Sequence, residues 1–143
     1  MRDEPQSLDK PAVDGSGHNV RNAQLAEPWY LAERCNLECG RANAPPLALL
    51  VVEAGRATGE QAADWLPQGL RRGDVVAHFG GGRFAILLPG AGAYDAGRVA
   101  ARIRQRDPRV EIGVAAYPQD GSNLGELVIA ALRELPGPFE MSA

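Results

Sequence analysis

The sequence predicts an α/β fold in which a mixed β-sheet carries helices on its faces. Short strand-like runs alternate along the chain with segments of helical periodicity. Residues 47–52 (LALLVV) form a continuous apolar run that is too short for a helix, which is typical of a strand buried on both faces. A glycine-rich turn at 80–82 separates two further strand-like runs and predicts a β-hairpin, because glycine readily takes positive φ.

The predicted elements follow the order helix, strand, helix, strand, strand, helix, strand, helix. Apolar side chains that recur every three to four residues predict helices over 28–41, 59–70, 93–104 and 123–135. Runs rich in apolar and β-branched residues predict strands over 47–52, 74–79, 84–88 and 110–117. We expect the hairpin of 74–79 and 84–88 at the centre of the sheet, with 47–52 alongside.

The length of 143 residues predicts one domain. Residues 1–25 are rich in Asp, Gly, Ser, Asn and Pro and have no apolar period, so they are predicted to be a flexible tail. The folded domain is expected over 26–138, and 139–143 form a short C-terminal tail.

Composition excludes several classes of function. A net charge of −3 and a pI near 5.4 argue against general nucleic-acid binding, which requires a basic face. No apolar run reaches the length of a membrane span, so membrane insertion is not expected. The first ten residues, MRDEPQSLDK, are polar and unlike a secretory signal. We therefore expect a cytoplasmic protein.

Cysteine and histidine give little sign of a metal site. Cys35 and Cys39 are one helical turn apart, a spacing that suits a metal, a redox pair or simply two half-buried helix residues. The last interpretation is favoured, because no second cysteine pair and no histidine lies nearby in the sequence. His18 and His78 are far apart and flanked by no metal-ligand pattern, so no metal is expected.

Several motifs in the order expected of one family give a more specific interpretation. They are LRRGDVVAHFGGGRFAILLP (70–89), AARIR (100–104) and IGVAAYPQDG (112–121). Together they resemble the RxxD motif, signature hairpin, helix and following strand of a GGDEF (diguanylate cyclase) domain. The resemblance covers roughly 28–135 and implies the palm-like fold of nucleotide cyclases.

The departures from the GGDEF pattern imply a degenerate domain that is not an enzyme. Cyclases of this family condense two GTP molecules with divalent cations held by carboxylates. Gly82 and Arg83 stand where the signature has acidic residues, and Glu53 occupies the place of the aspartate of the first strand. The interval between Glu53 and Gly80 is too short for the guanine-reading segment, and the lysine that binds the triphosphate has no counterpart. We expect a shortened active-site segment without cyclase activity.

The product-binding inhibitory site of the family is retained in the sequence. By resemblance, Arg71, Asp74 and Arg102 would bind cyclic di-GMP. Arginine can pair with guanine O6 and N7 or with a phosphate, and a carboxylate accepts from guanine N–H groups. Arg72 and Arg98 are nearby charges without an assigned role. The alternative interpretation is a solvated ion pair between Arg71 and Asp74 at the end of a helix.

Three functions follow, of which the first is favoured. The chain is expected to be a non-catalytic cyclic di-GMP receptor that signals through contact with an unidentified protein partner, using the tail or the face around Gly82. The second is an interaction protein that keeps the fold as a nucleotide-free scaffold. The third, residual GTP binding or catalysis, has the least support because the carboxylates are missing.

Overall fold

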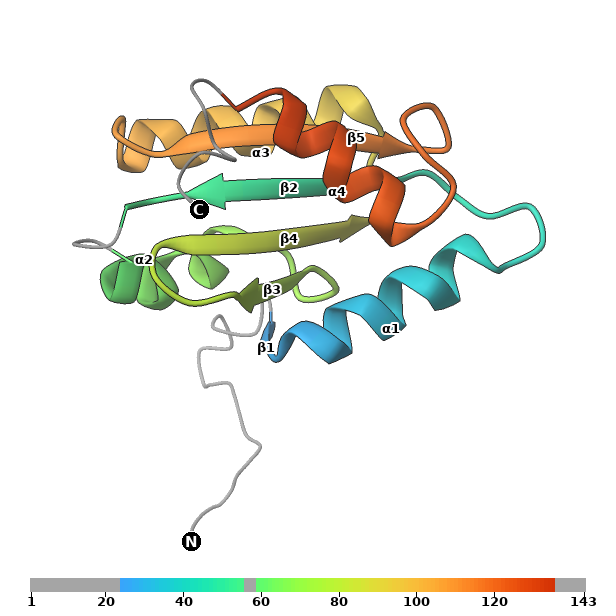
Figure 1. Ribbon diagram of the computed structural model, residues 1–143, viewed down its shortest axis with the longest axis horizontal. Coiled ribbons are helices and arrows are strands. Elements are labelled where there is room, and N and C mark those ends of the chain that lie inside the picture. Colours follow the sequence, from blue (N-terminus) through green and yellow to red (C-terminus); the bar gives the residue numbers. More distant parts are fainter. Residues whose placement is uncertain (1–23, 56–58, 136–143) are drawn as a thin grey trace, which may run out of the picture.

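The computed structural model of the chain describes residues 24–55 and 59–135, which form a mixed sheet flanked by helices (Figure 1). Within these residues the strands are β1 (Gln24–Ala26), β2 (Leu47–Glu53), β3 (Val75–His78), β4 (Arg83–Pro89) and β5 (Glu111–Tyr117). The helices are α1 (Pro28–Cys39), α2 (Gly59–Trp65), the 3₁₀ turn η3 (Pro67–Gly69), α3 (Ala93–Arg106) and α4 (Leu124–Arg133). The predicted fold class is confirmed.

The sheet has the order β1-β3-β4-β2-β5, so the hairpin strand β4 is central. Strands β3 and β4 pair antiparallel, with Val75 opposite Leu87, and their connection contains Gly80 and Gly81 at positive φ. Strand β2 pairs antiparallel with both β4 and β5. The predicted central hairpin beside 47–52 is therefore confirmed.

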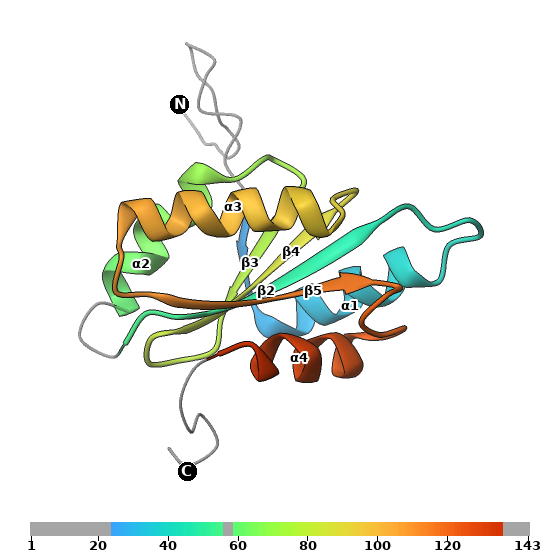
Figure 2. The same ribbon diagram turned by 90° about the horizontal axis from the view of Figure 1, so that it is seen from above.

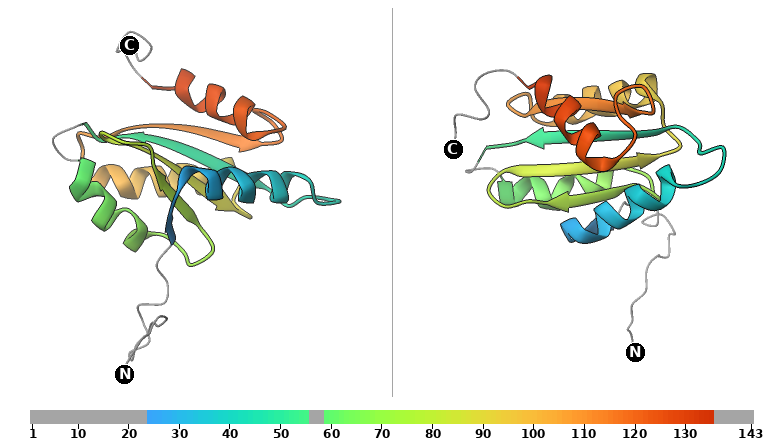
Figure 3. Two further views of the ribbon diagram at one scale, coloured as in Figure 1. Left: turned by 60° about the horizontal axis from the view of Figure 1, so that its bottom comes forward. Right: turned by 45° about the vertical axis from the view of Figure 1, so that its right-hand side comes forward.

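The core has two layers, one on each face of the sheet. Helices α2 and α3 cover one face, whereas α1 and α4 cover the other (Figure 2). The right-hand view in Figure 3 shows α1 and α4 on the same face of the sheet. Successive side chains of β2 alternate between the layers, with Leu50 in the α2–α3 layer and Leu49 in the α1–α4 layer. Because both faces are covered, the strand is apolar at nearly every position, as the run LALLVV predicts.

The helix predicted over 59–70 is shorter in the structure. Helix α2 ends at Trp65, and the separate turn η3 follows from Pro67 to Gly69. Proline lacks the N–H of an interior helical residue and its ring clashes with the preceding turn, so Pro67 cannot continue α2. This break matters for the site, because η3 leads directly to Arg71.

Strand β1 is not among the elements that the sequence predicts. It pairs parallel to β3, with Leu25 opposite Val76, and begins at Gln24, inside the segment 1–25 that was predicted to be a tail. Three residues carry too little periodicity to distinguish a strand from a loop. The remainder of that predicted tail, 1–23, and the predicted tail 139–143 lie outside the described residues.

The other helix ends differ from the predictions by one or two residues, which is the usual uncertainty of such boundaries. Helix α3 continues two residues beyond its predicted end, to Arg106. No helix in the described residues has the length and apolar character needed to cross a membrane.

Candidate functional site

The RxxD segment forms a tight turn between η3 and β3. The backbone N–H of Asp74 donates to the carbonyl of Arg71 at 3.0 Å, and the backbone N–H of Arg71 donates to Oδ2 of Asp74 at 2.9 Å. The Arg71 guanidinium donates to Asp74 Oδ1 at 3.3 Å and to the carbonyl of Pro89 at 3.1 Å. The motif is therefore a closed hydrogen-bonded unit whose arginine also reaches the end of β4.

The two charged groups of this turn differ in their exposure. The Asp74 side chain is only 2% exposed, whereas the Arg71 side chain is 67% exposed. A buried carboxylate is costly unless it is hydrogen-bonded, and both oxygens of Asp74 accept from Arg71. Asp74 thus holds the turn, and the Arg71 guanidinium is the group that solvent or a ligand can reach.

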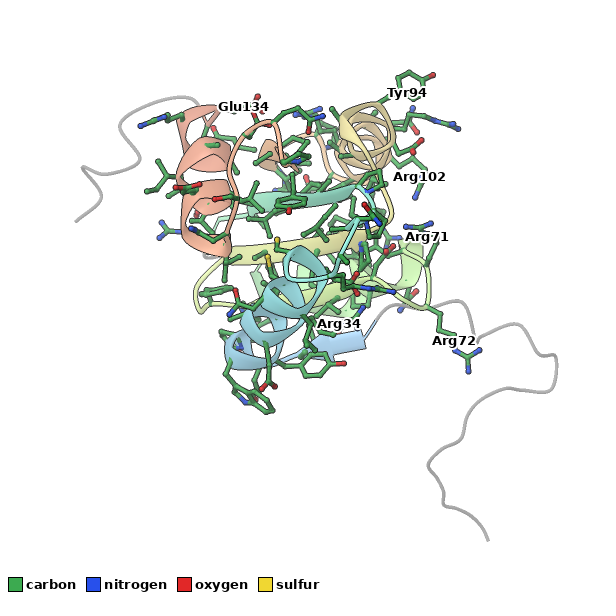
Figure 4. The ribbon with its side chains drawn as sticks, turned by 90° about the vertical axis from the view of Figure 1, so that its right-hand side faces the viewer. Arg34, Arg71, Arg72, Tyr94, Arg102 and Glu134 are labelled. Carbon is green, nitrogen blue, oxygen red and sulfur yellow. The ribbon has the colours of Figure 1, made fainter. Side chains whose placement is uncertain are left out.

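The three predicted site residues lie in one place. A cavity of about 300 Å³ is lined by Arg71, Asp74, Leu88, Ala91, Asp95, Arg98, Val99 and Arg102. Figure 4 shows the labelled side chains of Arg71 and Arg102 next to each other, whereas Arg72 points away from them. Arg102 is fixed by a hydrogen bond of 3.0 Å from its guanidinium to the carbonyl of Gly69 in η3. We call this cavity the RxxD pocket.

Two further charged residues of the RxxD pocket come from α3. Arg98 lies one helical turn before Arg102 and faces the same cavity, and Asp95 lies three residues before Arg98. The sequence contained a signal for Arg98, because residues at i and i+4 of a helix share a face. The same spacing rule places Asp95 on this face of α3, three residues before Arg98, although it was not among the residues predicted from the sequence.

The opposite end of the hairpin has a different character. The Arg83 guanidinium donates to Glu53 Oε1 at 3.0 Å, and these residues are directly opposite in the register of β2 and β4. A Cβ atom on Gly82 would lie 2.1 Å from the carbonyl oxygen of Gly55, and the backbone N–H of Ala54 donates to the Gly82 carbonyl at 2.7 Å. With this backbone, the third turn position has no room for any side chain.

Cysteine and histidine take structural positions in the described part of the chain. Cys35 is buried in the α1–α4 layer, and desolvation by burial, with the neighbouring Cys39, raises its pKa to about 12. Burial also raises the pKa of Cys39. His78 stacks on Phe84, with ring centroids 4.3 Å apart, and its Nε2 is 3.0 Å from the carbonyl of Gly81. Within 24–55 and 59–135 no three acidic, cysteine or histidine side chains gather as a metal site; His18 lies outside these residues.

Solved structures with the same architecture decide what the fold is. The GGDEF domain of YfiN (TpbB) from Pseudomonas aeruginosa superposes with a TM-score of 0.64 and 26% identity, over 76% of this chain and 86% of that one. A DGC protein from Thermotoga maritima gives a TM-score of 0.63 at 18% identity, over 82% of this chain and 98% of that one. The fold is that of a GGDEF domain. No protein-family model matches the chain, and neither does any curated protein sequence.

A third GGDEF neighbour was solved together with a protein partner. Diguanylate cyclase SiaD from Pseudomonas aeruginosa, in complex with its activator SiaC, gives a TM-score of 0.64 at 18% identity. The match covers 77% of this chain and 53% of that one. At this identity the likeness shows a shared fold.

Proposed function

We propose that this GGDEF-fold protein is a non-catalytic receptor for cyclic di-GMP that signals through contact with a protein partner. The observation that carries the proposal is the convergence of Arg71, Asp74 and Arg102 on one cavity. These residues come from a turn and a helix that are about 30 positions apart in the sequence, so the fold brings them together. Arg98 adds a third guanidinium to the same wall.

The chemistry of the RxxD pocket suits a guanine nucleotide with phosphate groups. A guanidinium can donate two parallel hydrogen bonds to guanine O6 and N7, or to a phosphate. The volume of about 300 Å³ is at the lower end of the range for ligand pockets. One guanine with its adjoining phosphate would therefore enter the pocket, and the other half of the dinucleotide would lie along the surface of α3.

In this proposal the hairpin turn has no catalytic role. Two-metal phosphoryl chemistry needs carboxylates around the cations. Here the Glu53 carboxylate is paired with Arg83, and Gly82 is packed against the backbone of Gly55. A guanidinium beside that carboxylate opposes the binding of Mg²⁺ by charge repulsion.

One observation favours the scaffold alternative. Asp74 is buried with both oxygens already hydrogen-bonded inside the turn, so the motif has a structural role without any ligand. A guanine N–H could reach this carboxylate only after the Arg71 guanidinium moves. Its long 3.3 Å contact with Asp74 and its high exposure make that movement inexpensive.

The test compares two neighbouring arginines. Arg71→Ala should weaken cyclic di-GMP binding by about tenfold to a hundredfold, since a good bidentate pair is worth roughly 1–3 kcal/mol. Arg72→Ala is the matched control, because it removes the same charge one residue away from a side chain that points away from the pocket. Calorimetric titration of both variants and the wild type at one salt concentration gives the comparison. Equal loss in both variants, or binding to none of the three proteins, would reject the RxxD pocket as the receptor site.

A further inference from the structure

A second cavity lies beside the RxxD pocket, between η3 and α3. Its volume is about 550 Å³, and its lining includes Trp65, Gln68, Val99, Arg102, Gln105 and Arg106. Val99 and Arg102 line both cavities, so the two are neighbours that share one wall. We call the second cavity the Trp65 groove. It lies where α2 ends at Trp65 and the short turn η3 follows.

The charge of the Trp65 groove is positive. Arg98, Arg102 and Arg106 are spaced i, i+4 and i+8, so they form one stripe along α3 that runs from the RxxD pocket into the groove. No aspartate or glutamate lines the groove. Within the described residues, no carboxylate forms an ion pair with any of the three. Exposed arginines without carboxylate partners are suited to bind an anion.

The groove also contains a planar, partly apolar surface. The Arg106 guanidinium lies over the Trp65 ring, with its central carbon 5.0 Å from the ring centroid. Flat heterocycles stack on tryptophan and on guanidinium planes. Gln68 and Gln105 add side-chain amides, of which Gln68 already donates to the carbonyl of Asp64 at 2.8 Å. Cations, a planar surface and amides in one cavity suit a ligand that carries both a flat base and a phosphate.

We propose that the Trp65 groove binds a nucleoside monophosphate. The dianionic phosphate pairs with Arg102 and Arg106, and the base stacks against the Trp65–Arg106 surface. This site does not depend on cyclic di-GMP binding, because only Arg102 and Val99 belong to both cavities. Because both cavities share Arg102, binding at one should weaken binding at the other. A phosphate that pairs with this guanidinium in one cavity leaves it unable to pair with a phosphate in the other.

Tryptophan fluorescence gives a direct readout of the groove. The sequence has two tryptophans, so Trp29→Phe leaves Trp65 as the single reporter. Titration of this protein with AMP and with GMP should quench Trp65 emission to saturation. Arg106→Gln in the same background should weaken binding about tenfold, the effect of losing one charged hydrogen bond. Arg133→Gln, on the exposed side of α4 in the opposite layer, is the matched control and should leave the affinity within twofold.

Additional titrations distinguish which part of the nucleotide binds and in which cavity it binds. Inorganic phosphate and adenosine alone should each bind at least tenfold more weakly than AMP, because each supplies only half of the contacts. Asp74→Asn alters only the RxxD pocket and should leave AMP affinity within twofold. Quenching that is lost in Asp74→Asn and kept in Arg106→Gln would place the nucleotide in the RxxD pocket and overturn the proposal. Absence of saturable quenching by either nucleotide would overturn it as well, whatever the result with cyclic di-GMP.

Discussion

At the residue scale, Asp74 is where the structural and the ligand-binding roles of the RxxD motif meet. Its carboxylate accepts from the backbone and the guanidinium of Arg71, and 2% of its side chain is exposed. A guanine edge would replace the guanidinium contact and leave the backbone contact in place. Variants of this residue must therefore be judged on stability as well as on affinity.

Asp74→Ala should lower the free energy of unfolding by about 1–3 kcal/mol, because it removes the partly buried hydrogen bond from the backbone N–H of Arg71 to a charged carboxylate. Asp74→Asn keeps an acceptor oxygen and should cost clearly less. Urea denaturation followed by circular dichroism measures both. An Asp74→Ala protein as stable as the wild type would show that the turn does not need this side chain.

The two cysteines should differ in reactivity. At pH 8, iodoacetamide should modify Cys39 before Cys35, because Cys35 is buried and its pKa is raised to about 12. The raised pKa of Cys35 also makes the stability of the fold depend on pH. Its contribution to the free energy of unfolding is fully present below the ordinary thiol pKa of 9.0 and is lost as pH rises through about 12. Peptide mapping by mass spectrometry over time gives the order of modification. Faster labelling of Cys35 would contradict the burial of this side chain between α1 and the sheet.

The sequence predicted only part of the RxxD pocket. Arg71, Asp74 and Arg102 were identified by the resemblance of their motifs to those of GGDEF domains, and the structure brings all three to one cavity. The Trp65 groove could not be predicted, since it depends on where α2 ends and on the packing of η3 against α3. Pro67 indicated that helix α2 would end before it, but the sequence around Pro67 does not indicate that a groove opens there.

At the element scale, helix α4 packs directly against the sheet at Gly113 of β5. A Cβ atom there would lie 1.8 Å from the carbonyl oxygen of Ala131 in α4. The helix therefore sits directly on the glycine backbone. By contrast, a Cβ atom on Gly97 of α3 would meet no atom within 4 Å.

These two glycines form a matched pair for substitution. Gly113→Ala should lower the free energy of unfolding by at least about 2 kcal/mol, because α4 must shift off the sheet. Gly97→Ala should raise it by roughly 0.5–1 kcal/mol, since alanine is the better helix former. Thermal and urea unfolding of both variants give the values. A Gly113→Ala protein that is as stable as Gly97→Ala would mean that α4 does not pack where the structure places it.

Elements were predictable where burial imposes a strong pattern. Strand β2 is buried over nearly its whole length and reads as an unbroken apolar run, and α3 shows its buried Ala96, Ala100 and Ile103 at helical spacing. Strand β1 was not predicted, because its three residues take their extended conformation from pairing with β3 rather than from their own sequence. A strand of this kind forms through tertiary contacts, which a short stretch of sequence does not reveal.

At the scale of the whole molecule, the fold is that of GGDEF domains, and we propose that the chain is not a cyclase because its hairpin turn, GGGR at 80–83, carries no acidic side chain. Incubation with GTP and Mg²⁺ or Mn²⁺ should yield no cyclic di-GMP above a control without protein. The double variant Gly82→Asp, Arg83→Glu should remain inactive too, because position 82 has no room for a Cβ atom against Gly55. Product formation by the unchanged protein would refute the non-catalytic assignment, and activity in the double variant would refute the steric argument.

We propose that cyclic di-GMP binds at the RxxD pocket and not at the hairpin turn. An NMR titration of the ¹⁵N-labelled protein with cyclic di-GMP tests binding and location together. We expect saturable shifts of the backbone amides of 71–74 and 98–102, with the amides of 80–83 unchanged. Shifts centred on 80–83, or a spectrum that does not change at all, would contradict it.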